Sequence, residues 1–270
     1  MILFPTSKLN LGLQIIAKRN DGYHDLQTVF YQFPLKDVLE ILIDETLSDG
    51  TCIFNSTGLP IPGGENLCEK AYYLLNKDFD LAGVQIHLHK IIPMGAGLGG
   101  GSADAAYTLR LLNTLFDLQI SANKLMEYAL MLGSDCPFFI NDYPQYAIGR
   151  GEVLEPIDLK LKGKYLVIIN PGIHISTKEV FSNIQPTTNK SCKEIVLQDI
   201  KEWKHTLVND FEKSVFPNYP ILVDLKKFLY KQGAEYAAMS GSGSTMFGIF
   251  NEKPELECHP KEYFVWETLL

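Results

Sequence analysis

The order of apolar and polar residues predicts β-strands over much of the chain. Apolar residues hold every second position from residue 9 to 15, and a similar run follows in YHDLQTVFYQF. This period of two is typical of strands with one covered face. The pair Asp21-Gly22 between the two runs favours a tight turn, so we expect the chain to open with a β-hairpin. Further strands are expected in DVLEILI, VQIHLHKII, KYLVIIN and YAAMSGSGSTMFGIF, the last folding back through a glycine turn.

Other stretches carry apolar residues at the three- and four-residue spacing of helices. One follows Asn66, a suitable N-cap, in NLCEKAYYLL, and another runs from Ala103 to Phe116 with Ser102 as its expected N-cap. Three more helices are expected at residues 122–132, 201–212 and 221–232. The mixture predicts an α+β protein. The turn residues of YAIGRGEVLEPI predict a boundary between two domains, 1–152 and 153–270.

Composition and charge narrow the classes of function. The 270 residues are 46% hydrophobic and carry a net charge of −8, which is unlike a nucleic-acid-binding protein with its basic face. No apolar run reaches the length of a membrane span. The first residues are apolar only as far as Phe4, before a proline, which is too short for a signal peptide. We therefore expect a cytoplasmic protein without nucleic-acid or membrane partners.

The cysteines are scattered and include no C-x-x-C pair, so neither a zinc site nor a disulfide framework is expected. They are Cys52, Cys68, Cys136, Cys192 and Cys258. Buried, reduced thiols fit a protein of the reducing cytoplasm.

A glycine-rich segment, IPMGAGLGGGSADAA at residues 92–106, joins a predicted strand to a predicted helix. Unpaired backbone N–H groups at the start of a helix bind anions, and the helix dipole adds to the attraction. A flexible connection is the alternative, but the glycines between Gly97 and Gly101 cost conformational entropy and need a reason. We therefore expect a phosphate site, and the length of the segment suits a triphosphate.

Two common phosphate-binding loops do not fit this segment. Gly95, Gly97 and Gly100 match G-x-G-x-x-G, but a Rossmann unit needs a buried parallel strand before the loop and a strand soon after the helix. Here the preceding strand alternates polar with apolar residues, and the helix is followed by another helix. A Walker A loop is excluded because no Gly-Lys-Ser/Thr ends the segment.

Phosphoryl transfer needs a carboxylate to accept the hydroxyl proton and cations to offset the phosphate charge. Asp135 in LGSDCPFF is a candidate base, with an N-cap ahead of Pro137 as the alternative. Lys8 in SKLNLGL is a candidate cation, with an ordinary exposed lysine as the alternative. Asn10, two residues further along the same predicted strand, shares the face of Lys8.

Two further features leave alternatives open. Tyr23 and His24 follow the tight turn and could stack on and hydrogen-bond a nucleobase, or be ordinary strand residues. The second glycine-rich turn, SGSGSTMF at residues 240–247, could be a hairpin loop or a second anion site.

Three blocks resemble, in this order, the GHMP small-molecule kinase superfamily: SKLNLGLQIIAKRNDGYH, PMGAGLGGGSADAA and MSGSGSTMF. The resemblance extends from Thr6 to about Phe250. It implies a two-domain GHMP kinase fold, with an N-terminal domain like domain 2 of ribosomal protein S5 and a ferredoxin-like C-terminal domain.

The K-x-N-L opening, the R-x-D-G-Y-H turn and the GLGGGS loop resemble one branch of that superfamily. Its members use ATP to phosphorylate the 2-hydroxyl of a cytidine diphosphate-linked methylerythritol, on the non-mevalonate route to isoprenoid precursors. Mevalonate and homoserine kinases have a shorter, GLGSS-like loop and lack the D-G-Y-H turn.

The resemblance also implies roles for single residues. Lys8 and Asp135 would be the catalytic pair, with Lys8 keeping the Asp135 base ionised. Asn66 and Lys90 would lie near the adenine and the nucleotide cleft. The phosphates would be wrapped by Pro93, Met94, Gly95, Ala96, Gly97, Leu98, Gly99, Gly100, Gly101, Ser102 and Ala103. Mg²⁺ is implied by ATP, although no residue is recognisable as its dedicated ligand.

For the acceptor, the resemblance implies that the cytidine stacks on Tyr23 and Phe181 while His24 contacts the edge of the base. Asn10 would help to hold the acceptor, and Thr177 lies on the same segment as Phe181, PGIHISTKEVF.

One position departs from the family pattern, since Ala103 stands where the commoner loop has a second serine. Two alternative functions remain: a GHMP kinase for another alcohol such as mevalonate or homoserine, and a catalytically silent nucleotide-binding regulator. Tyr23 and His24 argue against the first, because those acceptors have no base. The presence of both Lys8 and Asp135 argues against the second. The oligomeric state does not follow from the sequence.

Overall fold

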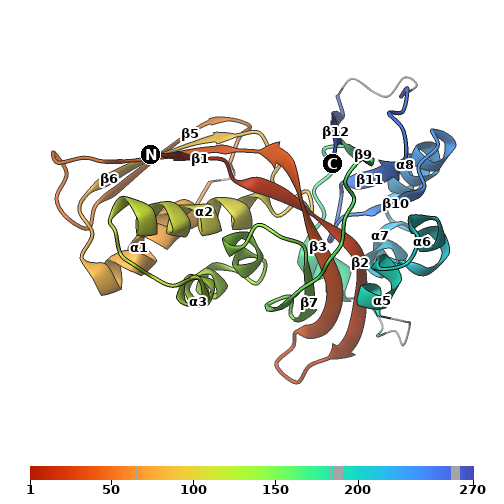
Figure 1. Cartoon of the computed structure of the whole chain (residues 1–270), viewed down its shortest axis with the longest axis horizontal. Coiled ribbons are helices and arrows are strands. Elements are labelled where there is room, and N and C mark those ends of the chain that lie inside the picture. The colour runs from red at the N-terminus through yellow and green to blue at the C-terminus, as the bar shows by residue number, and fades with distance from the viewer. Residues whose placement is uncertain (62, 65, 183, 185, 187–190, 257–261) are drawn as a thin grey trace. The chain divides into compact units, whose positions relative to one another are not determined.

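The computed structural model describes residues 1–61, 63–64, 66–182, 184, 186, 191–256 and 262–270 (Figure 1). The chain packs into two compact units, each built from several stretches. Unit 1 comprises Met1–Ser7, Leu35–Met94 and Gly99–Asp142, and unit 2 comprises Lys8–Pro34, Gly95–Leu98 and Tyr143–Leu270. The expected domain boundary at residue 152 stays a prediction.

Unit 1 contains a four-stranded sheet whose helices lie on one side of it (Figure 1). The sheet order is β1 (Ile2–Leu3), β4 (Val38–Ile43), β6 (Val84–Lys90) and β5 (Cys52–Gly58). β6 is antiparallel to β4 and parallel to β5. The residues of β6 alternate between buried and less buried positions, which confirms the one-sided cover expected from VQIHLHK.

The helices of unit 1 are α1 (Leu67–Phe79), α2 (Gly100–Leu115), α3 (Ala122–Leu132) and the short 3₁₀ helix η1 (Cys136–Ile140). Asn66 is the N-cap of α1, as predicted, and forms a capping box with Glu69. The predicted helix 122–132 is confirmed as α3.

The predicted start of α2 was wrong. The helix begins at Gly100, and its N-cap is Gly99 rather than Ser102. Gly99 has a φ of 72°, a left-handed conformation that glycine adopts without the steric penalty of a side chain. The chain therefore turns into the helix earlier than a serine cap would require, and Ser102 lies inside the first helical turn.

Unit 2 contains two four-stranded sheets. The first has the order β2 (Thr6–Lys18), β3 (His24–Lys36), β7 (Gln145–Gly149) and β8 (Val153–Pro156). Consecutive strands β2 and β3 are neighbours across the Asp21-Gly22 turn, which confirms the expected hairpin. The second sheet has the order β10 (Tyr236–Met239), β11 (Met246–Phe250), β9 (Tyr165–Asn170) and β12 (Phe264–Leu269).

The helices of unit 2 are α4 (Thr177–Ser182), α5 (Cys192–Val196), α6 (Ile200–Thr206), α7 (Phe211–Val215) and α8 (Pro220–Lys231). The prediction of one helix over 201–212 was wrong, because the chain leaves the helix at Leu207. Backbone bonds to Leu13 of β2 hold the segment between α6 and α7. The side chain of Asn209 also donates to the carbonyl oxygens of Met239 and Gly241. These long-range bonds outweigh the helical periodicity of the sequence.

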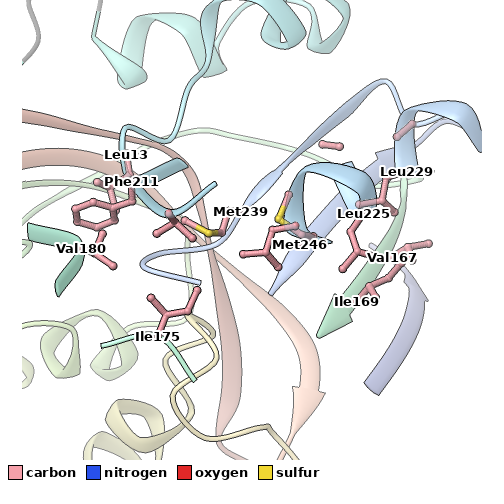
Figure 2. Close-up of a cluster of buried hydrophobic side chains, with 14 of the residues drawn as sticks. Leu13, Val167, Ile169, Ile175, Val180, Phe211, Leu225, Leu229, Met239 and Met246 are labelled. Carbon is pink, nitrogen blue, oxygen red and sulfur yellow. The ribbon is translucent and has the colours of Figure 1, made fainter. Parts of the chain in front are cut away.

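A hydrophobic cluster forms the core under the second sheet of unit 2 (Figure 2). Leu13 of β2 joins residues of β9, β10, β11 and α8, and Phe211 and Val180 pack at its margin (Figure 2). The hairpin strand β2 and the second sheet therefore share one core.

The four cysteines that the structure describes are buried and free, as expected. Cys258 lies outside the described residues. Over the described stretches, none of the helices has the length and apolar character needed to cross a membrane.

Candidate functional site

The glycine-rich segment leads directly into helix α2. Gly95, Gly97 and Gly99 have φ angles of 62°, 77° and 72°. The first intrahelical bond is made by the N–H of Ala103, which donates to the Gly99 carbonyl at 2.9 Å. The N–H groups of the first turn before Ala103 have no acceptor within the helix, and the positive end of the helix dipole lies there. The start of α2 thus has the backbone geometry of an anion site, while the Ala103 side chain is fully buried.

Asp135 lies in the link between α3 and η1, in the same unit as the start of α2. Asp135 holds the N-cap position of η1, ahead of Pro137, as the alternative predicted, but its side chain makes no capping hydrogen bond there. Burial raises the pKa of the neighbouring Cys136 thiol to about 12, the Asp135 charge adds to the effect, and a hydrogen bond with Ser102 opposes it. The helix η1, which begins at Cys136 directly after Asp135, packs against α2.

A cavity of about 150 Å³ opens in unit 1 where helices α1 and α2 begin. Apart from Asn66 and Asp104, its lining is apolar or glycine: Ile61, Gly63, Gly64, Leu67, Met94 and Gly101. Three predicted nucleotide residues, Asn66, Met94 and Gly101, thus line one cavity next to the candidate phosphate site.

Lys90, the other residue expected near the adenine, is enclosed by protein. Its ammonium donates to Asp37 at 2.5 Å and to Asp104 at 2.6 Å, and its side chain is fully buried. Burial alone would lower the pKa of Lys90, but the two carboxylates outweigh burial and raise it. Lys90 is therefore charged.

In unit 2, Lys8 and Asn10 lie side by side on β2, as the shared face predicted. The Lys8 ammonium donates to Asn10 Oδ1 at 2.5 Å and lies 5.1 Å from the centre of the Phe30 ring. Asn10 in turn donates to Thr28 Oγ1 at 3.0 Å. Lys8 is only 3% exposed, so the alternative of an ordinary surface lysine is wrong.

The second glycine-rich turn connects β10 to β11, which confirms the hairpin interpretation. It packs on the first part of the glycine-rich segment, residues 95–98, in unit 2. Ser240 Oγ donates to the Gly97 carbonyl at 2.8 Å, and the N–H of Thr245 donates to the Ala96 carbonyl at 3.3 Å. The Lys8 N–H holds the same segment by donating to the Leu98 carbonyl at 2.9 Å.

The residues expected to bind the acceptor also belong to unit 2. His24 and Phe181 stack on each other with ring centres 5.1 Å apart. Tyr23 is 57% exposed, and the Arg150 guanidinium lies 4.9 Å from its ring centre. Thr177 Oγ1 is 3.3 Å from Ser242 Oγ of the second glycine turn. The fold therefore brings His24 to Phe181, and Thr177 to the glycine turn.

Sequence reasoning missed Asp37 and Asp104, the two partners of Lys90. Asp104 carried a signal, because it is an acidic residue on a helix face that is otherwise apolar or small. Asp37 carried none, because its partner is 53 residues away in the chain. A cluster of three or more His, Cys, Asp or Glu that could hold a metal ion is absent from the described part of the chain.

Comparison with protein families gives two matches to this chain. The family described as GHMP kinases N terminal domain matches residues 66–142, and GHMP kinases C terminal matches residues 191–257. The chain belongs to the GHMP kinases. The first match contains the start of α2, Asp135 and part of the cavity lining, and the second contains the β10–β11 turn.

Individual relatives agree with this family. A protein of Bacteroides fragilis (strain YCH46) named 4-diphosphocytidyl-2-C-methyl-D-erythritol kinase is 52% identical over 261 residues, covering 95% of this chain and 94% of the relative. A solved structure of 4-(cytidine 5'-diphospho)-2C-methyl-D-erythritol kinase has a TM-score of 0.79 at 33% identity, covering 92% and 90% of the two chains. The mevalonate kinase of Methanococcus jannaschii shares the fold, with a TM-score of 0.71 at 15% identity over 99% and 97% of the chains.

Proposed function

We propose that this GHMP kinase transfers the γ-phosphoryl group of ATP to the 2-hydroxyl of 4-diphosphocytidyl-2-C-methyl-D-erythritol, giving the 2-phosphate and ADP in isoprenoid precursor synthesis. The kinase relatives that match nearly the whole chain support the substrate. The observation that carries the chemistry is that η1, which directly follows Asp135, packs against α2, whose first turn is the candidate anion site. A carboxylate and an anion-binding helix start in one place are what phosphoryl transfer requires.

ATP binds at the start of α2 in this proposal. Backbone N–H groups of residues 100–102 donate to phosphate oxygens, and the helix dipole stabilises their charge. The cavity between the starts of α1 and α2 receives the adenine. Because the segment contains no lysine, backbone groups do the work that a Walker lysine does elsewhere.

Asp135 acts as the general base. It accepts the proton of the 2-hydroxyl as the oxygen attacks the γ-phosphorus. The new O–P bond forms while the bond from the γ-phosphorus to the bridging oxygen breaks and leaves ADP. A correctly placed base contributes about 10²- to 10⁴-fold to such a rate. The pairing of Lys8 with Asp135 implied by the resemblance stays a prediction.

Mg²⁺ is proposed as the metal that accompanies ATP. The donors present fit a metal held mainly by phosphates and water, since Mg²⁺ commonly uses only one or two carboxylates of the protein. The Ser102 hydroxyl, in the first turn of α2, is the donor that this chain would add. The bound ion would offset charge on the phosphates.

The acceptor's cytidine is proposed to bind at Tyr23, His24 and Phe181. The stacking of His24 on Phe181 supports a shared site for these rings. Asn10 is proposed to hold the acceptor, and its amide already bonds both Lys8 and Thr28. The cytoplasmic location stays a prediction.

The deciding experiment is a substrate panel with labelled ATP, comparing the cytidylyl compound with mevalonate and homoserine. We expect transfer to the cytidylyl compound alone. Transfer only to another alcohol would replace the proposed substrate, and ATP binding without transfer to any alcohol would favour the silent regulator.

The base assignment is tested by Asp135→Asn, which removes the proton acceptor while keeping the shape of the side chain. We expect kcat to fall by roughly 10³-fold, with ATP affinity kept within a few-fold. Asp142→Asn is the matched control, since Asp142 pairs with Arg110 and its side chain is 63% exposed. Turnover of Asp135→Asn within a few-fold of the original protein would refute the assignment.

A further inference from the structure

A chain of hydrogen bonds within unit 2 ends at Lys8, the expected cation of the transfer. Thr28 of β3 donates its hydroxyl to the Gly12 carbonyl, and Thr28 Oγ1 accepts the side-chain amide of Asn10 at 3.0 Å. Asn10 Oδ1 in turn accepts the Lys8 ammonium at 2.5 Å. Lys8, Asn10 and Thr28 are all buried, so each of them depends on partners from the protein.

The direction of each bond follows from the chemistry of its two ends. A carbonyl oxygen only accepts, so the single hydroxyl proton of Thr28 is committed to Gly12. Towards Asn10, Thr28 Oγ1 can then only accept, and the amide must present its nitrogen to it. The amide oxygen is thereby turned towards Lys8, whose ammonium has donors only. Both ends of the chain therefore require the same orientation of the Asn10 amide.

This orientation needs to be fixed by hydrogen bonds, because the shape of an asparagine side chain does not fix it. Its last torsion, χ2, has only a broad preference, and the oxygen and nitrogen ends of the amide are similar in size. The Phe30 ring, whose centre is 5.1 Å from the Lys8 ammonium, attracts the charge but offers no single acceptor atom. Asn10 Oδ1 is therefore a contact that gives the ammonium a defined position.

The main chain of Asn10 is held separately from its side chain. The Asn10 N–H donates to Ser240 Oγ at 3.3 Å, and Ser240 Oγ donates to the Gly97 carbonyl at 2.8 Å. These bonds fix the point where the side chain begins, and they leave the orientation of its amide to Thr28 and Lys8. Loss of the Thr28 hydroxyl should therefore release the amide while the backbone of Asn10 stays in place.

We propose that Thr28 is a positioning residue of this kinase: its hydroxyl, committed to Gly12, fixes the Asn10 amide so that Oδ1 holds the Lys8 ammonium in place for the transfer. This inference rests on the proposed function, because it takes Lys8 as the cation that assists the acceptor hydroxyl. Thr28 acts through Asn10 and is not itself a catalytic residue. A displacement of about 1 Å in a reacting group can lower a rate by about 10²-fold, so the orientation of one amide is enough to affect turnover.

The test is Thr28→Val, which keeps the branched shape of the side chain and removes the hydroxyl. We expect kcat to fall roughly 10- to 100-fold while the KM for ATP stays within about threefold, because the change affects the transfer rather than ATP binding. Thr28→Ser restores the hydroxyl and should recover kcat to within about fivefold of the original protein. A kcat of Thr28→Val within threefold of the original, or an equal fall in both variants, would overturn the proposal.

Ser7→Ala is the matched control. Ser7 Oγ donates to the Leu35 carbonyl at 3.0 Å in a buried setting, and the two residues lie on β2 and β3, the strands that carry Asn10 and Thr28. Both Ser7→Ala and Thr28→Val leave a buried carbonyl without its hydroxyl partner, so both should lower the stability to urea. We expect kcat to stay unchanged in Ser7→Ala. A comparable fall in kcat would show that any weakening of these strands slows the transfer, and the proposal would be wrong.

The route through Asn10 is tested by combining Thr28→Val with Asn10→Ala. Asn10→Ala removes the amide that Thr28 orients, so in this background Thr28→Val should lower kcat by less than about threefold further. If Thr28→Val kept its full effect without the Asn10 side chain, Thr28 would act by another route, and the proposed chain of hydrogen bonds would not explain its role.

A direct readout is the exchange of the Asn10 side-chain amide protons with deuterium, followed by NMR. The Asn10 signal is identified by its absence from the spectrum of Asn10→Ala. Exchange should be roughly 10-fold faster in Thr28→Val, as expected for the loss of one hydrogen bond, and slow again in Thr28→Ser. An unchanged exchange rate in Thr28→Val would overturn the proposal. If Thr28→Val does not fold, Thr28→Cys gives the same comparisons, because a thiol is only a weak donor and acceptor.

The kinetic measurements are made with whichever alcohol accepts phosphate, so they separate the two proposals. Transfer to a different alcohol, with a kcat that depends on Thr28 as described, would refute only the proposed substrate. Phosphorylation of the cytidylyl compound with kcat unaffected by Thr28→Val would refute only the role of Thr28. Absence of transfer to any alcohol would overturn both.

Discussion

Two glycine-rich segments of this chain look alike in sequence and differ in what their polar groups do. In the turn at residues 240–245, Ser240 Oγ donates to the Gly97 carbonyl and Ser244 Oγ to the Ile173 carbonyl. The Gly241 carbonyl accepts the amide of Asn209. Because these groups bond to other parts of the protein, the turn has a structural role: it holds neighbouring segments together. At residues 99–102, by contrast, the chain enters α2 with N–H groups that have no acceptor in the helix.

The difference shows that glycine content alone does not mark a ligand site. Glycine also allows two backbones to approach closely, and both uses occur within the first segment. Its residues 95–98 pack against the 240–245 turn in unit 2, while residues 99–103 belong to unit 1. Substitutions by alanine separate the glycines needed for close packing from those needed for a ligand.

The largest expected effect is that of Gly97→Ala. A Cβ atom there would lie 2.0 Å from the Ser240 carbonyl oxygen, and the φ of 77° adds strain. Because the clashing atom belongs to the backbone, it cannot move away by a change of side-chain rotamer. We expect the free energy of unfolding in urea to fall by at least about 3 kcal/mol, the sum of a left-handed side chain and overpacking.

Gly22→Ala is the control for backbone strain alone. Gly22 has a φ of 85°, and a Cβ there would meet nothing within 4 Å. We expect a loss of about 1 kcal/mol, from the left-handed conformation only. Equal losses at the two positions would mean that close packing between the segments adds nothing to stability.

The sequence predicted most of the elements on which these segments lie. The capping signal of Asn66, the Asp21-Gly22 hairpin and the α3 helix are local, and local physics sets them. The β10–β11 hairpin was predicted, but the bonds made by Ser240 and Ser244 were not, because their acceptors come from distant parts of the chain. The spacing of apolar and polar residues does not predict such long-range hydrogen bonds.

The residues of the candidate site likewise fall into those that the local sequence predicts and those that only the fold brings together. The proximity of Lys8 and Asn10 was predictable, because residues two positions apart in a strand lie on the same face. The group of Lys90 with Asp37 and Asp104 does not, because its members come from three elements and only the fold brings them together. A buried charge is costly without partners. An acidic residue such as Asp104 within a run of small and apolar helix positions is therefore a signal worth following in other sequences.

A middle-sized effect is expected where α2 begins, from Gly100→Ala. A Cβ atom there would lie 2.9 Å from Ile92 Cγ2 and 3.0 Å from the Lys90 ammonium. Since Lys90 is fixed by two carboxylates, it cannot move away without weakening them. We expect a loss of about 2 kcal/mol in the free energy of unfolding, which is typical of overpacking.

Gly101→Ala is the matched control in the same helical turn. The nearest atoms to its Cβ, in Leu67 and Met94, are 3.8 Å away. Helix propensity favours alanine over glycine by about 1 kcal/mol, so this variant should be as stable as the original protein or more so. If Gly101→Ala destabilised the protein as much as Gly100→Ala, the packing explanation for Gly100 would fail.

The smallest effect is expected from Ser240→Ala, which tests the structural role of the turn at residues 240–245. The change removes the hydroxyl that donates to the Gly97 carbonyl at 2.8 Å and accepts the Asn10 N–H at 3.3 Å. Both partners are left without that bond in a buried setting, so we expect a loss of about 1 to 2 kcal/mol by urea unfolding. Ser242→Ala, in the same turn, removes a hydroxyl whose contact with Thr177 is exposed. Its effect should stay within about 0.5 kcal/mol. If Ser242→Ala destabilised the protein more than Ser240→Ala, the exposed hydroxyl would contribute more to stability than the buried one. The proposed difference between the two glycine-rich segments would then be wrong.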